Sequence, residues 1–312
     1  MSNANFNGLR VLALESRRAR EIAQLITNCG GDPVVAPSVR EVALESNQEA
    51  LEFIHKLRDG HIDIVIFMTG VGVRALARAV ESICSQSQLA TLLSQVTIVA
   101  RGPKPGAALR EMAVRVSLSV PEPNTWRDLL RMLDEKKDTF PLQGCRIAVQ
   151  EYGVSNPALL AGLEQRGARV FPVCVYEWAL PEDTGPLQAA VTSIILGEVH
   201  VMLVASSIQI RHLFQVADSM ACAIALHDAL AQVVIASIGP LTSEELRSRG
   251  LNVDMECAHP KMGFLVQEAA EMSGQILQQK KRAKTARGRQ PENDCLSRRS
   301  ACERSGRTSY EQ

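Results

Sequence analysis

Two turns of the chain combine glycine, proline and a polar residue in a pattern that favours binding of an anion. The first is Gly239-Pro240-Leu241-Thr242, which follows the apolar run 233–238 and precedes a predicted helix over 242–249. The second, Gly102-Pro103-Lys104, lies 137 positions earlier and follows the apolar run 96–100. A helix N-terminus carries the positive end of the helix dipole and N–H groups without intrahelical partners. Gly102, Lys104, Gly239 and Thr242 are therefore candidate anion-binding residues.

Three further turns follow predicted strands. Thr69-Gly70-Val71-Gly72 follows the run 62–68, Ser206-Ser207 follows 200–205, and the turn 151–155 follows 145–150. In open α/β sheets, ligands bind beyond the carboxyl ends of parallel strands. These turns add six candidate binding residues: Thr69, Gly70, Gly72, Tyr152, Ser206 and Ser207. The alternative is that glycine and proline serve only turn geometry, that Thr242 only caps its helix, and that Lys104 is a solvated cation.

The sequence lacks the residues that several other kinds of binding site require. The six histidines form no H-x-x-x-H or H-x-x-E pair, which argues against a metal site. The turn Thr69–Val73 is not a G-x-G-x-x-G sequence and lacks the acidic residue of a dinucleotide site. Aromatic residues make up 4% of the chain, which leaves little surface for stacking of nucleic-acid bases. We expect no metal, no dinucleotide and no nucleic-acid partner.

Apolar runs typical of buried strands alternate with segments of helical periodicity. Strands are expected over 9–14, 62–68, 96–100, 114–120, 145–150, 200–205, 233–238 and 251–257, with extended runs over 32–42 and 169–180. Helices are expected over 17–29, 46–58, 72–84, 105–112, 125–136, 157–166, 186–196, 242–249 and 262–278, with two short pieces in 85–94 and two helices in 208–231. The alternation predicts an α/β fold with parallel sheets that are covered on both faces.

The chain is predicted to contain two copies of one α/β unit. Thr69 matches Ser206 at the offset of 137 that relates the two Gly-Pro turns, and Arg10 matches Arg146 at an offset of 136. If the two extended runs pair, they form a two-stranded bridge, and the N-terminal βα segment completes the sheet of the C-terminal lobe. We therefore predict a discontinuous first domain, a second domain and two inter-domain linker strands: 1–34 plus 180–273, 41–168, and 35–40 with 169–179.

The composition limits the number of domains and indicates the cellular compartment. A chain of 312 residues with 46% hydrophobic content suits two domains. Eight cysteines include no C-x-x-C pair, which favours free thiols in a reducing cytoplasm. No apolar stretch reaches 18 residues, so no membrane span is expected. Residues 280–312 hold ten Lys/Arg and four Asp/Glu without periodicity, and we expect a disordered basic tail over 279–312.

Three sequence patterns resemble the uroporphyrinogen-III synthase family, over about residues 9–273. One is Ile238-Gly239-Pro240-Leu241-Thr242 followed by Gly250-Leu251-Asn252-Val253. Another runs from Arg166-Gly167 through Val175-Tyr176 to Pro181, and the third joins Ser206-Ser207 to Ile210-Arg211-His212-Leu213. The resemblance implies two doubly wound, flavodoxin-like parallel-sheet domains joined by a two-stranded β linker, with substrate bound in the cleft between them.

The resemblance also implies a reaction. A cytoplasmic lyase of haem and other tetrapyrrole biosynthesis would close hydroxymethylbilane into uroporphyrinogen III, with loss of water and inversion of ring D. It would need no metal or organic cofactor, and its candidate turns would bind the substrate's eight carboxylates. Tyr176 matches the tyrosine of the linker pattern, which implies a donor or general acid for hydroxyl departure. The alternative is a tyrosine that only packs beside Trp178. The resemblance also implies a monomer, with hand-over of substrate from hydroxymethylbilane synthase as a candidate interaction.

Three positions depart from the family pattern. Glu15-Ser16-Arg17 stands where a Thr-Arg-Pro-like turn is frequent, Thr69-Gly70-Val71-Gly72 where a Thr-Ser-x-Asn-Gly-like turn is frequent, and Ala205 where Thr is frequent. These departures keep a second interpretation open, a diverged non-catalytic two-lobed module that binds tetrapyrroles or another small ligand. A sensor of the periplasmic-binding-protein type is less favoured, because its cleft would usually be lined with aromatic residues.

Overall fold

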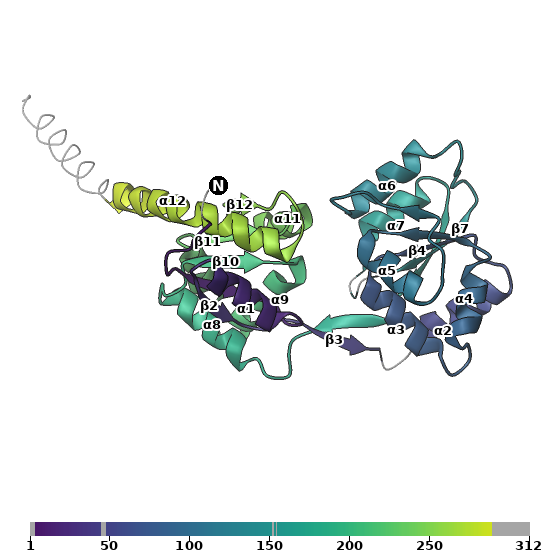
Figure 1. Ribbon diagram of the computed structural model, residues 1–312, viewed down its shortest axis with the longest axis horizontal. Helices are drawn as coiled ribbons and strands as arrows, with labels where there is room; N and C mark the ends of the chain where they lie inside the picture. Colours follow the sequence, from purple (N-terminus) through teal and green to yellow (C-terminus); the bar gives the residue numbers. More distant parts are fainter. Residues whose placement is uncertain (1–3, 45–47, 152, 154, 289–312) are drawn as a thin grey trace, which may run out of the picture. The chain divides into compact units, whose positions relative to one another are not determined.

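The computed structural model describes residues 4–44, 48–151, 153 and 155–288. It divides the chain into two compact units, with boundaries at Ser38/Val39 and Glu182/Asp183. The N-terminal and C-terminal segments form the first unit and the middle of the chain forms the second (Figure 1). Each unit contains a five-stranded parallel sheet, and a third sheet has two antiparallel strands. The predicted fold class is confirmed.

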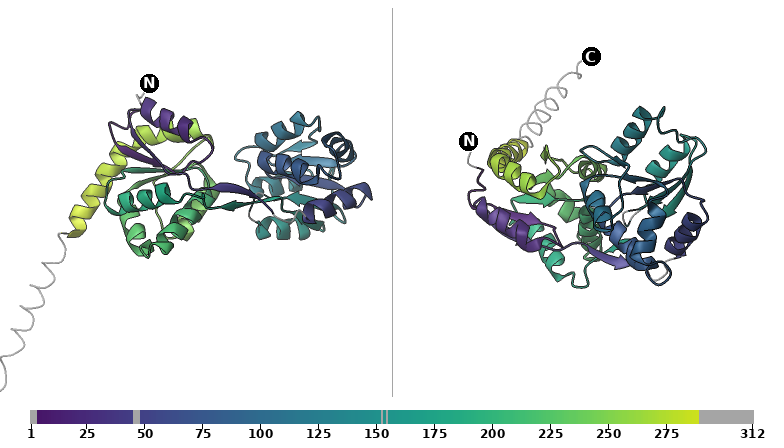
Figure 2. Two further views of the ribbon diagram at one scale, coloured as in Figure 1. Left: turned by 90° about the horizontal axis from the view of Figure 1, so that it is seen from below. Right: turned by 45° about the vertical axis from the view of Figure 1, so that its right-hand side comes forward.

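The first unit's sheet has the strand order β12-β11-β10-β1-β2. Its strands are β1 (Arg10–Ala13), β2 (Asp32–Val35), β10 (Val201–Val204), β11 (Val234–Ser237) and β12 (Met255–Glu256). Helices α1 (Ala19–Asn28) and α12 (Met262–Gly288) contact each other and pack on one face (Figure 2). The other helices are α8 (Gly185–Ile195), α10 (Ala223–Leu230) and α11 (Pro240–Ser248), each in contact with α9 (Ser207–Ser219).

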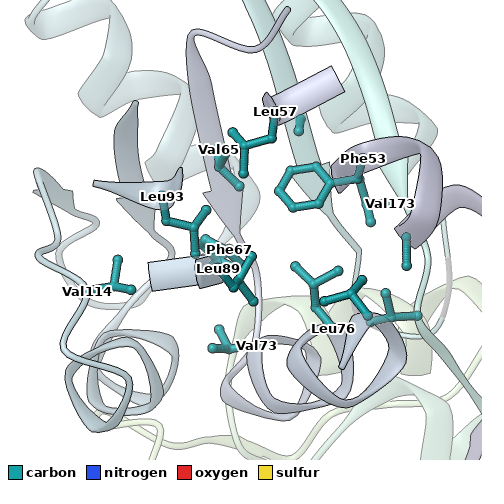
Figure 3. Packing of buried hydrophobic residues seen from close by; sticks show 14 of the residues in the cluster. Phe53, Leu57, Val65, Phe67, Val73, Leu76, Leu89, Leu93, Val114 and Val173 are labelled. Atoms are coloured by element: carbon teal, nitrogen blue, oxygen red, sulfur yellow. The ribbon is translucent and has the colours of Figure 1, made fainter. Parts of the chain in front are cut away.

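The second unit's sheet has the order β6-β5-β4-β7-β8. Its strands are β4 (Ile64–Phe67), β5 (Thr97–Ala100), β6 (Leu118–Ser119), β7 (Arg146–Gln150) and β8 (Arg169–Val173). On one face lie α2 (Gln48–Arg58), α3 (Gly70–Val80), α4 (Gln86–Leu93) and α5 (Pro103–Glu111), whose core includes Phe53, Val65 and Leu76 (Figure 3). On the other face lie α6 (Trp126–Glu135) and α7 (Pro157–Glu164).

Each sheet joins segments that are far apart in the sequence. In the first unit β1 pairs with β10, with Val11 opposite Val201, and in the second β4 pairs with β7, with Ile64 opposite Ile147. The N-terminal βα segment therefore completes a sheet made of C-terminal strands. With strands numbered along the chain, the first unit's sheet has the flavodoxin-like order 2-1-3-4-5 and the second unit's sheet has the order 3-2-1-4-5. The switch point lies between β1 and β10 in the first unit and between β4 and β7 in the second.

Each of the two extended runs contains one strand of a five-stranded sheet and one linker strand, so the linker strands are shorter than predicted. The run 169–179 contains two strands, because β8 pairs with β7 whereas β9 (Tyr176–Ala179) pairs antiparallel with β3 (Arg40–Ala43). β8 belongs to the sheet since Phe171 and Val173 pack in the apolar core beside α2. The run 32–42 likewise divides into β2, in the first sheet, and β3. A buried edge strand and a linker strand have similar composition, so the sequence did not separate them.

Three helices begin two residues earlier than predicted, and their first residues explain why. α3 begins at Gly70 because the Thr69 side chain caps it. α5 and α11 begin at Pro103 and Pro240, since the fixed φ of proline suits the first helical position. The two short pieces predicted in 85–94 are a single helix, α4.

The C-terminal helix is longer than predicted. α12 continues to Gly288, whereas the sequence predicts a disordered tail from residue 279. Leu277 is buried, and the ammonium of Lys280 donates to the carbonyl of Val233 (2.6 Å) and pairs with Asp254 (2.7 Å). These contacts stabilise polar turns that hydrophobic periodicity does not reveal. The rest of the predicted tail lies outside the described residues. In the described ranges, no helix is long and apolar enough to cross a membrane.

Candidate functional site

The switch point of the second unit carries a pair of hydroxyl side chains. Thr69 follows β4 and caps α3, and Tyr176 is the first residue of β9. Their hydroxyl oxygens lie 3.1 Å apart, at hydrogen-bond distance. Thr69 Oγ1 also accepts the N–H of Gly72 at 2.9 Å, and its own proton can be donated to the Tyr176 oxygen. The structure therefore brings together two residues that the sequence suggested separately.

Packing fixes the position of the Tyr176 ring. Tyr176 is 2% exposed and meets Trp178 edge to face, with ring centroids 5.3 Å apart and an interplanar angle of 88°. Gly153 has a φ of +78°, and a Cβ there would lie 2.9 Å from the Tyr176 ring. A side chain at position 153 would collide with the rings of Tyr176 and Trp178. The packing beside Trp178 is thus present, and the hydroxyl has a polar partner as well.

Gln150, which the sequence analysis missed, completes this cluster. It ends β7, is 1% exposed, and its Oε1 accepts the N–H of Thr69 at 3.4 Å. Its amide occupies the space that a Cβ on Gly72 would need. The sequence did contain a signal for Gln150, because it is a polar residue at the end of the apolar run 145–150. A buried amide is normally hydrogen-bonded, so a polar residue in such a place is a candidate for a specific contact.

The turns at Gly70 and at Gly102–Lys104 adjoin one another. A Cβ on Gly70 would lie 2.7 Å from the carbonyl oxygen of Lys104, so only glycine allows this approach of α3 to α5. The Lys104 side chain itself is exposed. Two of the predicted turns are therefore neighbours at the carboxyl edge of the second unit's sheet.

Gly102 is the N-cap residue of α5 and has a φ of 142°, which favours glycine. A Cβ there would lie 2.7 Å from Oδ1 of Asn124, a residue that the sequence analysis did not select. That oxygen is buried and has no hydrogen-bond partner in the part of the chain that the structure describes. Pro103 and Pro105 have no N–H, so this helix start offers an anion fewer donors than the dipole argument assumed.

In the first unit, Ser206 and Ser207 stand at the equivalent position, after β10 and at the start of α9. The side chain of Gln209 accepts the N–H groups of Ala205 (2.8 Å) and Ser206 (3.2 Å). Its Nε2 donates to the carbonyl of Leu14 at 3.1 Å and so bridges the ends of β10 and β1. Gln209 follows Ser206 at capping-box spacing, which was a signal for it in the sequence.

Gly239 occupies the N-cap position of α11. The Ser237 hydroxyl donates to its carbonyl at 3.0 Å, and the N–H of Thr242 donates to the same carbonyl at 3.1 Å. The interpretation of Thr242 as the cap is wrong, because Gly239 takes that place and Thr242 lies inside the first turn, 4% exposed. Tyr152, the remaining predicted residue, lies outside the described residues.

The charged side chains of Glu151, which follows β7, and of Arg74, in α3, both have partners within the chain. The Glu151 carboxylate is 6% exposed and accepts from the Ser155 hydroxyl (2.9 Å) and the Asn156 N–H (3.1 Å). The guanidinium of Arg74 holds Glu111 through two nitrogens and keeps the pKa of that carboxyl below its usual range. Among the residues described, no group of three His, Cys, Asp or Glu side chains can hold a metal ion. The arrangement can orient a ligand and donate hydrogen bonds to it.

Fold and site together define a class of protein. It has two doubly wound parallel-sheet units, with hydroxyl and amide side chains at the carboxyl ends of the switch-point strands. Residues 20–267 match the family model described as uroporphyrinogen-III synthase HemD. Because that range covers most of the chain, the chain belongs to the uroporphyrinogen-III synthase family, as the sequence patterns suggested.

The chain is also similar to individual proteins. The chain is 28% identical over 265 residues to "Uncharacterized protein YjjA" of Bacillus subtilis, over 85% of this chain and 96% of that protein. It is 28% identical over 234 residues to "Putative uroporphyrinogen-III synthase" of Methanothermobacter thermautotrophicus, over 75% and 87%. A mutant Uroporphyrinogen III Synthase of Thermus thermophilus has the same fold, with a TM-score of 0.64 and 24% identity over 86% of this chain and 100% of that one.

Proposed function

We propose that this chain is an active uroporphyrinogen-III synthase, a hydro-lyase that cyclises hydroxymethylbilane to uroporphyrinogen III. The observation that supports activity most directly is the Thr69–Tyr176 hydrogen bond at the switch point of the second unit. Ligands of open α/β sheets bind at this edge. Membership of the synthase family over residues 20–267 supplies the substrate class.

In the proposed reaction Tyr176 assists departure of the substrate's hydroxyl group. The N–H of Gly72 donates to Thr69, Thr69 donates to the Tyr176 oxygen, and the phenol proton moves to the departing group. Hydrogen bonds arranged in such a chain strengthen one another. The phenol supplies the proton with which hydroxide leaves as water. Because Tyr176 is buried and Thr69 is half-buried, the departing group approaches from the Thr69 side.

Positioning accounts for the rest of the proposed chemistry. Loss of the hydroxyl leaves an azafulvenium ion that the pyrrole nitrogen stabilises, and the substituted α-carbon of ring D attacks it. The bond from that carbon to its original methylene bridge then breaks, and the bridge bonds instead to the free α-carbon of ring D. The proton lost from that carbon returns to the Tyr176 phenolate. Holding the two reacting carbons together lowers the barrier without further acid or base groups. The substrate's carboxylates would bind to the remaining candidates among the described residues through N–H groups, hydroxyls and one ammonium: Gly70, Gly102, Lys104, Ser206, Ser207, Gly239 and Thr242.

The decisive experiment separates product isomers. Hydroxymethylbilane generated in situ is incubated with the protein, and the products are oxidised and resolved as uroporphyrin isomers. Spontaneous closure gives isomer I, so an active synthase diverts the product to isomer III. Saturable substrate binding without this diversion would instead favour the diverged binding module. The turn Thr69-Gly70-Val71-Gly72, which departs from the family pattern, is the reason for testing that alternative.

The role of Tyr176 has its own test. Tyr176→Phe should lower the rate of isomer III formation by about 100-fold or more, the usual contribution of a positioned acid. Trp178→Phe is the matched control, because it alters the ring that packs against Tyr176 but removes no hydroxyl. A Tyr176→Phe enzyme with the wild-type rate would remove this assignment and leave the proposed synthase activity intact.

A further inference from the structure

A basic pocket lies at the amino edge of the second unit's sheet, where β7 and β8 begin. It has a volume of about 460 Å³, and its lining includes Lys56, His61, Arg146, Arg169 and Phe171. That volume is in the range of small-molecule sites. The Thr69 turn follows the opposite end of β4, and a four-residue strand is roughly 13 Å long. The pocket is therefore distinct from the candidate synthase site.

Two arginines stand side by side in this pocket. Arg146 and Arg169 are direct partners in the register of β7 and β8, whose backbones lie about 4.8 Å apart in a sheet. Both project to the face that α2 covers, since Ala148 and Phe171, two residues further along each strand, pack in the core on that face. Like charges on directly opposed residues repel each other. The pair therefore favours a nearby anion.

The protein supplies only part of the necessary negative charge. Asp63 holds Arg146 through two bonds, Oδ1 to Nη2 at 2.6 Å and Oδ2 to Nε at 2.9 Å, and this contact lowers the pKa of Asp63. Lys56 pairs with Glu52 at 3.1 Å on the same helix. Within the ranges that the structure describes, neither Arg169 nor His61 has an acidic partner. One unbalanced cation, Arg169, remains beside the fixed guanidinium of Arg146.

Apolar side chains complete the lining of the pocket. The ring of Phe171 is half-buried, and the ammonium of Lys56 lies 5.1 Å from its centroid in a cation–π contact. Ile62, 4% exposed, also lines the pocket. We propose that this pocket binds a small organic anion, with its planar or apolar body against Phe171 and its carboxylate or phosphate between Arg169 and Lys56. The binding does not depend on synthase activity.

Equilibrium dialysis with 2-naphthoate tests the proposal on the full-length protein. The expected result is saturable binding with a Kd of about 1 mM or tighter. The neutral analogue 2-naphthylmethanol should bind at least tenfold more weakly, because it cannot pair with Arg169. Competition by benzoate and by phenyl phosphate then shows which acid group the site prefers, and displacement by either one supports the proposal.

Two variants move the affinity in opposite directions. Arg169→Gln should weaken naphthoate binding about tenfold or more, since a charge-assisted hydrogen bond is lost. Asp63→Asn should tighten it severalfold, because Arg146 is then free to bind the ligand. Arg78→Gln, at an exposed position of α3, is the matched control, and circular dichroism checks that each variant is folded. Equal binding of the neutral analogue, or equal affinity in Arg169→Gln and Arg78→Gln, would overturn the proposal.

Discussion

At the scale of single residues, Gly72 shows how the absence of one methyl group fixes a neighbouring amide. The residue is the third in α3, where alanine would normally be more favourable than glycine by about 1 kcal/mol. Here a Cβ would overlap the amide of Gln150, which is buried and accepts the N–H of Thr69. The packing of the site therefore opposes the intrinsic preference of the helix.

We therefore predict that one substitution has opposite effects on stability in two backgrounds. Gly72→Ala should destabilise the wild-type protein by about 1–3 kcal/mol, because the displaced Gln150 amide loses its bonds. In a Gln150→Ala background, the same change should stabilise by up to about 1 kcal/mol. Urea denaturation of the four proteins gives the coupling energy. Additive effects would mean that Gln150 moves aside without cost.

The ion pair between Asp63 and Arg146 predicts a pH dependence. The hydrogen bonds from Arg146 lower the pKa of Asp63 in the folded protein, so folding is stabilised above the unfolded pKa of about 3.9. This stabilisation is lost as pH falls through the lowered folded pKa. Because both side chains are partly exposed, the effect at pH 7 should be about 1 kcal/mol or less.

The corresponding measurement is the pH dependence of unfolding. Asp63→Asn should lower the free energy of unfolding at pH 7, and its curve should converge with that of the wild type at the acid end. Asp59→Asn, in the exposed turn after α2, is the control and should follow the wild-type curve throughout. A constant difference between Asp63→Asn and wild type at every pH would exclude the titration as its cause.

Residue types in the site were easier to predict than residue partners. Thr69 and Tyr176 stood out because each follows a recognisable pattern, but their bond depends on where β9 begins beyond the edge strand β8. Gln150 was not chosen as a candidate because one polar residue at the end of an apolar run has no periodic pattern. The start of α11 was predicted at Thr242 rather than Pro240, since proline and threonine both favour helix starts and only the backbone shows which residue comes first.

At the scale of elements, the close approach of α3 and α5 brings two turns of the candidate site together. Gly70 allows it, because a Cβ there would meet the backbone carbonyl of Lys104 at 2.7 Å. A backbone atom, unlike the end of a flexible side chain, cannot move aside alone. The whole start of α5, with Gly102 as its cap, would have to shift.

Two glycine substitutions should therefore behave oppositely. Gly70→Ala should cost about 1–3 kcal/mol of stability and, because it separates the two turns, also weaken substrate binding. Gly106→Ala, within α5 and with open space around the added methyl group, should stabilise by up to about 1 kcal/mol. Thermal denaturation and substrate KM are the measurements. If both variants have the same stability, the approach of α3 to α5 does not depend on Gly70.

Element types followed from the sequence more reliably than element ends. Alternating apolar runs and helical periods predicted the parallel strands and their covering helices, since burial on both faces leaves a strong pattern. Ends depended on single contacts. The turn of α12 around Lys280 is held by bonds from the Lys280 side chain to Val233 and Asp254, residues that are far away in the sequence. No local pattern contains that information.

At the scale of the whole molecule, the chain leaves the first unit after Ser38 and returns to it at Asp183. The departing and returning segments run together, because β3 pairs with β9 and Arg40 lies opposite Ala179. Directly paired residues of antiparallel strands have Cα atoms about 5 Å apart. The second unit is thus an insertion whose two ends are neighbours, the arrangement in which domains tolerate excision.

This arrangement predicts that the units fold separately. A fragment of residues 39–182, and a chain in which Ser38 is joined to Asp183 through a short Gly/Ser linker, should each unfold cooperatively, because each keeps its whole five-stranded sheet and its own apolar core. The calorimetric unfolding enthalpies of these two proteins should add up to that of the full chain. A fragment cut at residue 168 is the control, because it lacks β8 and should lose cooperativity. If the fragment 39–182 shows no cooperative transition, folding of the second unit requires the first.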